Sequence, residues 1–304
     1  MDTSLPLPTY RDSFQRILAA FQTDSTSQRE KLEAKLRQTP FLRCRNAASN
    51  QIAYRLPESA YFATDKLTTL FAGISVIWFV DDQFESHRGE LPRKLLEACG
   101  VRDYLRRVEI PASLTYEDKA ALRLQKGASK CSRENESADF DVAGLRASVE
   151  AIAALPPHQA VHQALNLWQV LLDTLREARD TFFQGWYGWG FHRDDWNAYF
   201  PAQFLKDIRQ IPWIPLADGT LKAPISLRFS ELPDTFRLAP NATLQDLLGF
   251  KPEIIQQLAQ EAGIDPESLD LFEKARAYRR KTLRAAAKGW YGEPAIPDRW
   301  RSAP

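Results

Sequence analysis

Two segments far apart in the chain follow the same plan: a proline, a short apolar strand, a polar turn and a second strand. The first covers residues 40–55 and turns at residues 46–50, whereas the second covers residues 212–222 and turns at Asp218-Gly219. The Asp-Gly pair is the stronger signal, because tight hairpin turns need residues that tolerate positive φ. We therefore predict two antiparallel β-hairpins, which any fold of this chain must accommodate.

The likeness between the two segments continues beyond the hairpins. The matching pairs are residues 56–59 with 223–226, residues 67–71 with 244–248, and Gly100-Val101 with Gly249-Phe250. The spacing drifts by several residues, so a second interpretation stays open, in which two unrelated hairpins share proline and aromatic chemistry. A degenerate duplication predicts an α+β fold, mostly helical, with two small hairpin-containing lobes.

Helix signals are frequent. Ser27 and Glu30 have capping-box spacing and predict a helix that ends before Pro40, and Thr115 and Asp118 repeat that spacing. Further helices are predicted at residues 252–263 and 265–287, and from Pro157, whose helix carries Val161, Leu165, Trp168, Leu172 and Leu175 on one face. The β-branched and aromatic run at residues 74–80 predicts a buried strand.

A polar stretch, GASKCSRENESAD, separates the two predicted lobes. Its glycine, serines and low apolar content are typical of an exposed connection. We predict a first lobe at residues 1–130, a connection at 131–140, a second lobe at 141–288 and an extended tail at 289–304.

Charge and cysteine content limit the possible partners and compartment. The 304 residues carry 40 basic and 39 acidic side chains, so there is no whole-protein field that would attract nucleic acid or an anionic membrane. Cys44, Cys99 and Cys131 have no CxxC spacing, which argues against a disulfide framework or a zinc site. Neither a signal peptide nor an apolar run long enough to span a bilayer is evident. We expect a cytoplasmic protein with no membrane partner.

An acidic cluster follows the run at residues 74–80. Asp81, Asp82, Glu85 and His87 could hold the ion of a metal-dependent nuclease or hydrolase, because carboxylates at a strand end suit magnesium. No lysine or further acid can be placed beside them, so we interpret them as solvated turn residues and keep the Asp81–Glu85 enzyme as a minor alternative.

Other catalytic signatures are missing from the sequence. His158 and His162 share one helix face, but no third metal ligand is evident, so they are expected on the surface. There is no P-loop, no Gly-x-Gly-x-x-Gly and no Gly-x-Ser-x-Gly. We predict a protein that is not an enzyme, uses no cofactor or metal, and does not bind ATP tightly.

The densest aromatic stretch lies at residues 182–200. Trp186, Tyr187 and Trp189 within it are candidates for a partner interface, because large aromatic side chains bring contact area at low entropy cost. The competing interpretation places them in a core between a helix and a strand.

The last predicted helix is the one local charge asymmetry. Its basic residues, with no acid between them, are Lys274, Arg276, Arg279, Arg280, Lys281, Arg284 and Lys288. Such a run can contact phosphates or an acidic protein, and a solvated terminal helix is the alternative.

A series of segments runs through residues 30–263 in this order: PFLRCRNAASNQIAYRLPESAYF, WFVDDQFES, LLEACGVRDYLRR and LNLWQVLLDTL, then IPWIPLADGTLKAPISLRFSELPDTF and LLGF. On these segments, and over most of this range, the chain resembles the region that follows the ATP-binding domain in sacsin-like and NO VEIN-like proteins. Those proteins carry a GHKL-type ATPase domain that this chain lacks, so no ATP-site residue carries over. The resemblance implies a chaperone-like role, as in sacsin, or a part in antiviral defence, as in bacterial relatives.

From the resemblance we expect a non-catalytic interaction or coupling module of a sacsin-like ATPase assembly. Its partner would be a protein, such as a separate GHKL-type ATPase subunit. The alternative is a nucleic-acid-binding component that uses the basic helix.

Overall fold

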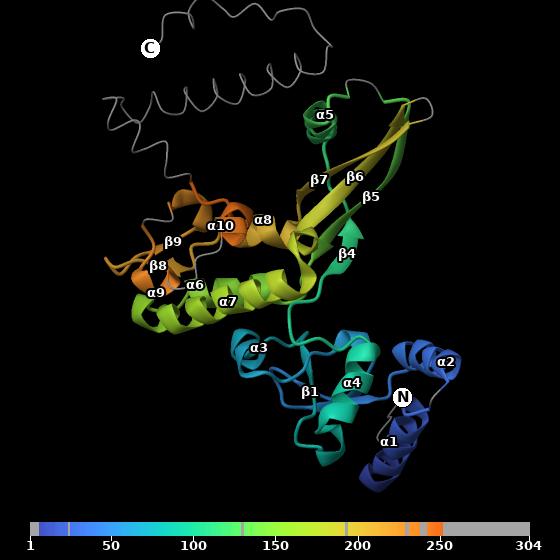
Figure 1. Cartoon of the computed structure of the whole chain (residues 1–304). Helices are drawn as coiled ribbons and strands as arrows, with labels where there is room; N and C mark the ends of the chain where they lie inside the picture. Colours follow the sequence, from blue (N-terminus) through green and yellow to red (C-terminus); the bar gives the residue numbers. More distant parts are fainter. Residues whose placement is uncertain are drawn as a thin grey trace, which may run out of the picture.

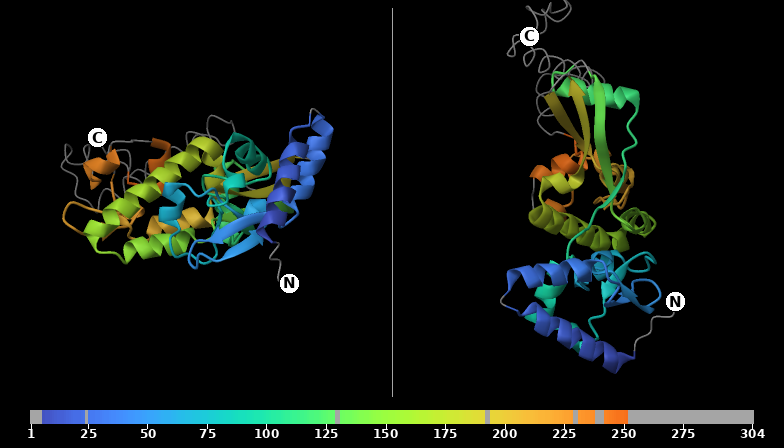
Figure 2. Two further views of the ribbon diagram at one scale, coloured as in Figure 1. Left: turned by 90° about the horizontal axis from the view of Figure 1, so that it is seen from below. Right: turned by 90° about the vertical axis from the view of Figure 1, so that its right-hand side faces the viewer.

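The computed structural model describes residues 6–23, 25–128, 131–191, 194–228, 231–237 and 242–251 (Figure 1). The fold is α+β, mostly helical, with small antiparallel sheets. In Figure 1 an N-terminal lobe lies below a layer of helices, and a sheet that we call the arm projects upward from that layer. Figure 2 shows the same order of parts from the side.

The N-terminal lobe contains helices, two 3₁₀ turns and a small sheet with strand order β2-β1-β3. Its elements are α1 (Leu7–Phe21), α2 (Thr26–Arg37), β1 (Leu42–Asn46), β2 (Ile52–Arg55), the 3₁₀ turn η1 (Pro57–Ser59), α3 (Asp65–Leu70), β3 (Trp78–Val80), the 3₁₀ turn η2 (Glu85–His87) and α4 (Glu90–Ala98). The predicted hairpin is confirmed, since β1 pairs antiparallel with β2.

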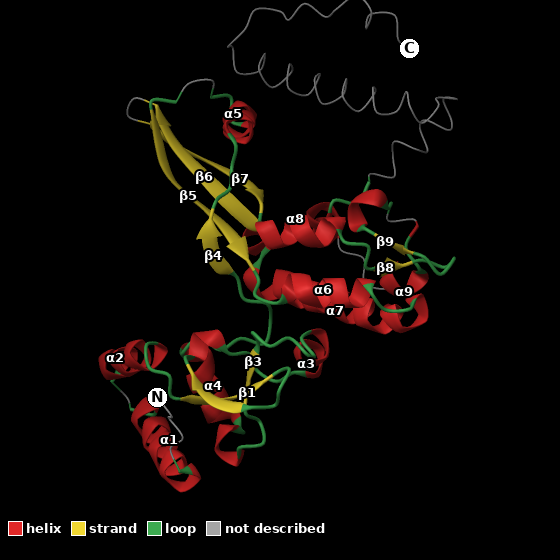
Figure 3. Cartoon of the chain, turned by 180° about the vertical axis from the view of Figure 1, so that it is seen from behind, coloured by secondary structure: helices red, strands yellow, loops and turns green. Residues whose placement is uncertain are grey.

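The arm is a four-stranded antiparallel sheet in the order β4-β5-β6-β7. Its elements are β4 (Val108–Pro111), α5 (Tyr116–Gln125), β5 (Arg133–Asp141), β6 (Gln184–Phe191) and β7 (Asp194–Pro201). The capping box at Thr115 and Asp118 is confirmed at the start of α5. Figure 3 shows α5 near the far end of the sheet.

The helical layer and the second hairpin form the C-terminal lobe. Its elements are α6 (Leu145–Ala153), α7 (Pro157–Ala178), the 3₁₀ turn η3 (Asp180–Phe183), α8 (Gln203–Gln210), β8 (Ile214–Pro215), β9 (Leu221–Lys222), the 3₁₀ turn η4 (Pro224–Ser226), α9 (Asp234–Arg237) and α10 (Ala242–Leu248). The second hairpin and the helix that begins at Pro157 are confirmed.

One hydrophobic core joins the two lobes through α7. Tyr61 and Phe71 of the first lobe share this core with Trp168 of α7 and Trp213 of the second hairpin. α3 packs on α7, and Lys66 forms an ion pair with Asp173 there. Because α7 is contacted on two sides, its most buried residues include Ala160, Ala164, Leu167 and Leu171 rather than the predicted face, of which only Trp168 is fully buried.

Two element predictions were wrong at their boundaries. The helix expected from Ser27 begins at Thr26 and is capped by Ser25, whose hydroxyl accepts from the Gln28 N–H. Ser25 and Gln28 have the same capping spacing two residues earlier in the chain. Of residues 74–80 only 78–80 form a strand, because the buried Asn46 amide binds the carbonyls of residues 75 and 77 and holds them in a turn.

The predicted connection at residues 131–140 was also wrong. Most of this segment is β5, which lies inside the arm sheet between β4 and β6. Arg133, Glu134, Asn135 and Glu136 are all exposed, because this part of the strand lies in the projecting part of the arm. A strand exposed on both faces has the polar composition of a loop, and that composition misled the prediction.

The two hairpins continue into turns with the same hydrogen bonds. In the first lobe Ser59 N–H and Oγ–H donate to the Leu56 carbonyl at 2.9 and 2.7 Å. In the second lobe Ser226 N–H and Oγ–H donate to the Ala223 carbonyl at 3.0 and 2.7 Å. The turn residues therefore match in geometry as well as in sequence.

A helix ending in a glycine then closes each unit. Gly100 and Gly249 both have positive φ and both donate to the third residue before them at 3.1 Å. Two residues after each glycine, the backbone forms a parallel bridge with the residue two positions after the 3₁₀ turn. Arg102 pairs in this way with Tyr61, and Lys251 pairs with Arg228. The structure thus supports a duplicated unit. In this duplicated unit, residues 244–248 correspond to the end of α4. The predicted match of residues 244–248 with residues 67–71 was wrong.

Candidate functional site

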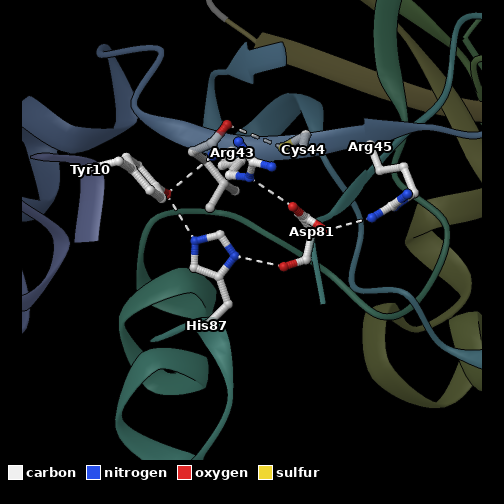
Figure 4. A network of polar contacts seen from close by, with 7 residues as sticks. Tyr10, Arg43, Cys44, Arg45, Asp81 and His87 are labelled. Carbon is white, nitrogen blue, oxygen red and sulfur yellow. Dashed lines mark hydrogen bonds and ion pairs between the residues drawn. The ribbon is translucent and has the colours of Figure 1, made fainter. Parts of the chain in front are cut away.

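Two members of the cluster predicted after residue 80, Asp81 and His87, belong to a buried polar network in the N-terminal lobe (Figure 4). β1 alternates its side chains, so that Leu42, Cys44 and Asn46 are buried while Arg43 and Arg45 lie on the other face. These two arginines meet Asp81, the first residue after β3.

Asp81 is held by both guanidinium groups. Arg43 Nε lies 2.8 Å from Oδ2 and an Arg45 terminal nitrogen lies 3.0 Å from Oδ1, while only 3% of the Asp81 side chain is exposed. Burial alone would raise the pKa of Asp81, but the hydrogen bonds and charges of the two arginines outweigh it and lower that pKa. Both carboxylate oxygens are therefore already occupied.

His87 is fixed from both ring nitrogens. Nδ1 lies 3.0 Å from the Asp81 backbone carbonyl, which can only accept, so Nδ1 carries the proton. Nε2 then accepts from the Tyr10 hydroxyl at 2.8 Å, and that hydroxyl accepts in turn from the Arg43 N–H. Burial lowers the pKa of His87 to about 4 and raises that of Tyr10. His87 is neutral at neutral pH.

This arrangement ties α1 and η2 to the hairpin. Asp82 and Glu85 are exposed and take no part in it. Within the described residues no group of three His, Cys, Asp or Glu side chains is placed to hold a metal ion. The network is a structural cluster, in which both carboxylate oxygens of Asp81, both ring nitrogens of His87 and the Tyr10 hydroxyl already have partners.

The aromatic candidates Trp186, Tyr187 and Trp189 do not form a surface. Tyr187 and Trp189 are buried together on the α5 side of the sheet, with ring centroids 5.3 Å apart, and Trp186 packs partly buried against the main core. Their place corresponds to the core interpretation, because β6 is an inner strand of the arm.

Other aromatic side chains of the arm are exposed. Tyr116 on α5 is 79% exposed, and Trp196 and Tyr199 on β7 are 39% and 55% exposed. β7 pairs only with β6 in the sheet order. The alternation of β7, with Ala198 and Phe200 buried between exposed residues, was present in the sequence and could have identified them.

A second polar network holds α5 on the sheet. The buried Arg123 donates to the Tyr187 hydroxyl at 2.8 Å, and Lys119 lies 2.6 Å from Glu134 of β5. Burial raises the pKa of Tyr187 and outweighs the opposing effect of Arg123. α5 is thus anchored to both β5 and β6.

The opposite face of the arm carries a polar bridge across β6. Asp195 of β7 accepts from Arg133 and Asn135 of β5 at 2.8 and 3.0 Å. Gly190 makes this possible, because a Cβ there would lie 2.5 Å from Arg133 Nε; at Gly188 a Cβ would lie 3.2 Å from the Asn135 Cβ. The glycines of β6 leave room for side chains from both neighbours.

The remaining sequence candidates are not brought together. His158 and His162 are exposed on α7, and Cys44, Cys99 and Cys131 are free thiols. The basic residues Lys274, Arg276, Arg279, Arg280, Lys281, Arg284 and Lys288, and the helices predicted at 252–263 and 265–287, lie outside the described residues. No helix of the described part has the length and apolar content needed to cross a membrane.

Comparisons of the chain with protein-family models, with curated proteins and with solved structures each return no match.

Proposed function

We propose that this chain is an interaction module that couples a sacsin-like ATPase assembly to a protein partner, and that the arm meets the partner. One observation carries this proposal: every Phe, Tyr or Trp side chain left exposed among the described residues belongs to the arm. These are Tyr116, Trp196 and Tyr199. Aromatic residues are enriched at protein interfaces because they bury much surface at little entropic cost.

The base of the arm is built to hold it rigidly. Asp139 at the inner end of β5 is buried and accepts from the Gln203 N–H at 2.8 Å, so it caps α8. Lys206 of α8 lies 3.4 Å from the same carboxylate. A rigid base supports the proposal, because a projecting interface on a fixed support loses less entropy when it binds.

The identity of the assembly rests on the resemblance of residues 30–263 to sacsin-like proteins. A separate subunit with a GHKL-type ATPase domain is the partner we propose. The chain itself contains no phosphate-binding loop, so the module would act on nucleotide hydrolysis only through that partner.

Affinity capture from the native host, followed by cross-linking mass spectrometry, tests the proposal. The arm variant combines Tyr116→Ala, Trp196→Ala and Tyr199→Ala. The control combines Leu7→Ala, Val76→Ala and Ile225→Ala, which are also exposed apolar residues but lie away from the arm. We expect one ATPase-domain protein to be recovered at least tenfold less with the arm variant and unchanged with the control. Equal recovery with both variants contradicts the proposal.

The nucleic-acid alternative makes a different prediction. Binding through phosphates would weaken with salt, with a log–log slope of about −0.9 per phosphate contacted on duplex DNA. Submicromolar, salt-sensitive binding of a random oligonucleotide would favour that alternative if it is lost when Arg279, Arg280, Lys281 and Arg284 are changed to glutamine.

A further inference from the structure

Strand β7 is the longest sheet edge in the described part of the chain (Figures 1 and 3). It has eight residues, whereas the edge strands β2 and β4 have four each and β8 and β9 two each. The outer side of β3 is bridged by Tyr61. Short or covered edges are the usual protection against unwanted pairing. β7 is not short, and within the described residues α5 packs on one face of the strand but does not pair with its outer backbone groups.

The register identifies the backbone groups of β7 that face outward. Just beyond the ladder, Ala202 N–H donates to the Phe183 carbonyl at 2.9 Å, and hydrogen-bonded pairs then alternate along an antiparallel ladder. Residues 196, 198 and 200 therefore bond to β6, while residues 195, 197 and 199 present their N–H and C=O groups away from the sheet. Among the described residues these outward groups have no backbone partner.

The middle of this edge lacks the features that block strand addition. Pro201 protects one end only. From residue 195 to 201 the one charged side chain is Asp195, and Arg133 and Asn135 already neutralise and hold it across β6. This part of the edge, with no unpaired charge, suits neither a phosphate backbone nor a charged peptide.

We propose that the β7 edge receives an extended, uncharged peptide segment of a partner protein, which adds to the arm as another strand. This inference rests on the proposed function, since it assigns the contact within the arm. Main-chain hydrogen bonds to residues 195, 197 and 199 supply the attraction in such an addition. Trp196 and Tyr199 lie on opposite faces of the sheet and favour β-branched or aromatic partner residues beside each.

The test uses the full chain and a phage-displayed library of random linear peptides as the probe. Asn197→Pro is the key variant, because it removes an outward N–H and leaves the β6–β7 ladder complete. We expect selected peptides in which β-branched and aromatic residues alternate with uncharged polar ones. Synthetic copies should bind at least tenfold more weakly to Asn197→Pro. N-methylation of every second peptide nitrogen should abolish binding when the methylated set is the one that faces β7, and should leave binding unchanged when it is the other set.

Two further variants keep the test decisive. Asn197→Lys places a charge on the edge without changing the backbone, and should weaken binding to the same extent. Ala121→Lys adds the same charge on the exposed side of α5 and should leave binding unchanged. Circular dichroism confirms that each variant is folded.

Several results would overturn the inference. These are a library that yields no peptide, peptides that bind all variants equally, or a selection dominated by charged sequences. A dimer in sedimentation that Asn197→Lys dissociates would show that a second copy of the chain occupies the edge. If the captured ATPase is lost with the triple arm variant but kept with Asn197→Pro, the proposed function stands and the edge inference fails.

Discussion

The N-terminal lobe and the arm treat their polar groups in opposite ways. In the lobe, Asp81, His87 and Tyr10 each bond to groups inside the fold, and the outer side of β3 is bridged by the chain itself. In the arm, β7 leaves backbone groups and two aromatic side chains at the surface. The difference suggests that the lobe serves stability and the arm serves contact. Substitutions in the core and the lobe should therefore change stability, and substitutions at the arm edge should change partner binding.

The largest effect is expected in the shared core. Trp213 is fully buried and its indole N–H donates to the Ile208 carbonyl at 2.9 Å. Trp213→Ala should lower the free energy of unfolding by about 3–5 kcal/mol, because it leaves a large cavity. Chemical denaturation measures this, with Trp196→Ala on the arm as the matched control. Equal losses of unfolding free energy in Trp213→Ala and Trp196→Ala would contradict the difference proposed between the core and the arm.

Acid should weaken the lobe before it weakens the arm. His87 has a pKa of about 4 in the fold and 6.5 as its ordinary value, so between these the unfolded chain binds the extra proton. Stability should fall by about 3 kcal/mol as pH drops from about 6.5 to 4, at about 1.4 kcal/mol per pKa unit. His87→Gln should flatten this dependence in denaturation curves, whereas exposed His158→Gln should leave it. If the free energy of unfolding of His87→Gln still falls between pH 6.5 and 4, groups other than His87 cause the pH dependence.

Within the arm, the anchor of α5 should matter more than the exposed edge. Tyr187→Phe removes the acceptor of buried Arg123. The loss of a hydrogen bond to a charged group lowers the free energy of unfolding by about 1.5–3 kcal/mol. Hydrogen exchange should show faster opening of α5 and unchanged protection of α7. If α5 and α7 respond alike, the arm and its base unfold as one unit.

The smallest effect on stability is expected at the outer edge. Tyr199→Ala should change the free energy of unfolding by less than about 0.5 kcal/mol, because the side chain is exposed. Thermal denaturation measures it, and partner capture should fall in the same variant. A loss of several kcal/mol would mean that Tyr199 packs in the fold instead of facing a partner.

Local signals in the sequence were sufficient for elements whose cause is local. Asp218-Gly219 and the Thr115 cap each determine a turn or a helix start within a few residues, and both were predicted. Asp81 could not be understood in this way. Its arginine partners come from a strand nearly forty positions earlier in the chain, so the sequence showed an acidic turn where the fold has a closed ion-pair cluster.

The arm was missed for a related physical reason. Hydrophobic patterning identifies strands that face a core, but the outer half of β5 faces solvent on both sides and has no such pattern. In β6 the glycines that accommodate Arg133 and Asn135 also read as turn residues. For the buried Trp189 the sequence left both a surface and a core position open, because only the position of α5 decides between them.

The parallel bridges that close each repeated unit also explain why the two copies are hard to align. Tyr61 meets Arg102, and Arg228 meets Lys251, so the chain between each pair is a loop whose ends are clasped. The first loop is nearly twice as long as the second. Doubling a loop costs only about 0.6 kcal/mol of closure entropy. A clasped unit can therefore hold different numbers of elements, as the first holds α3, β3 and α4 and the second α9 and α10, while its turn and its glycine keep their places.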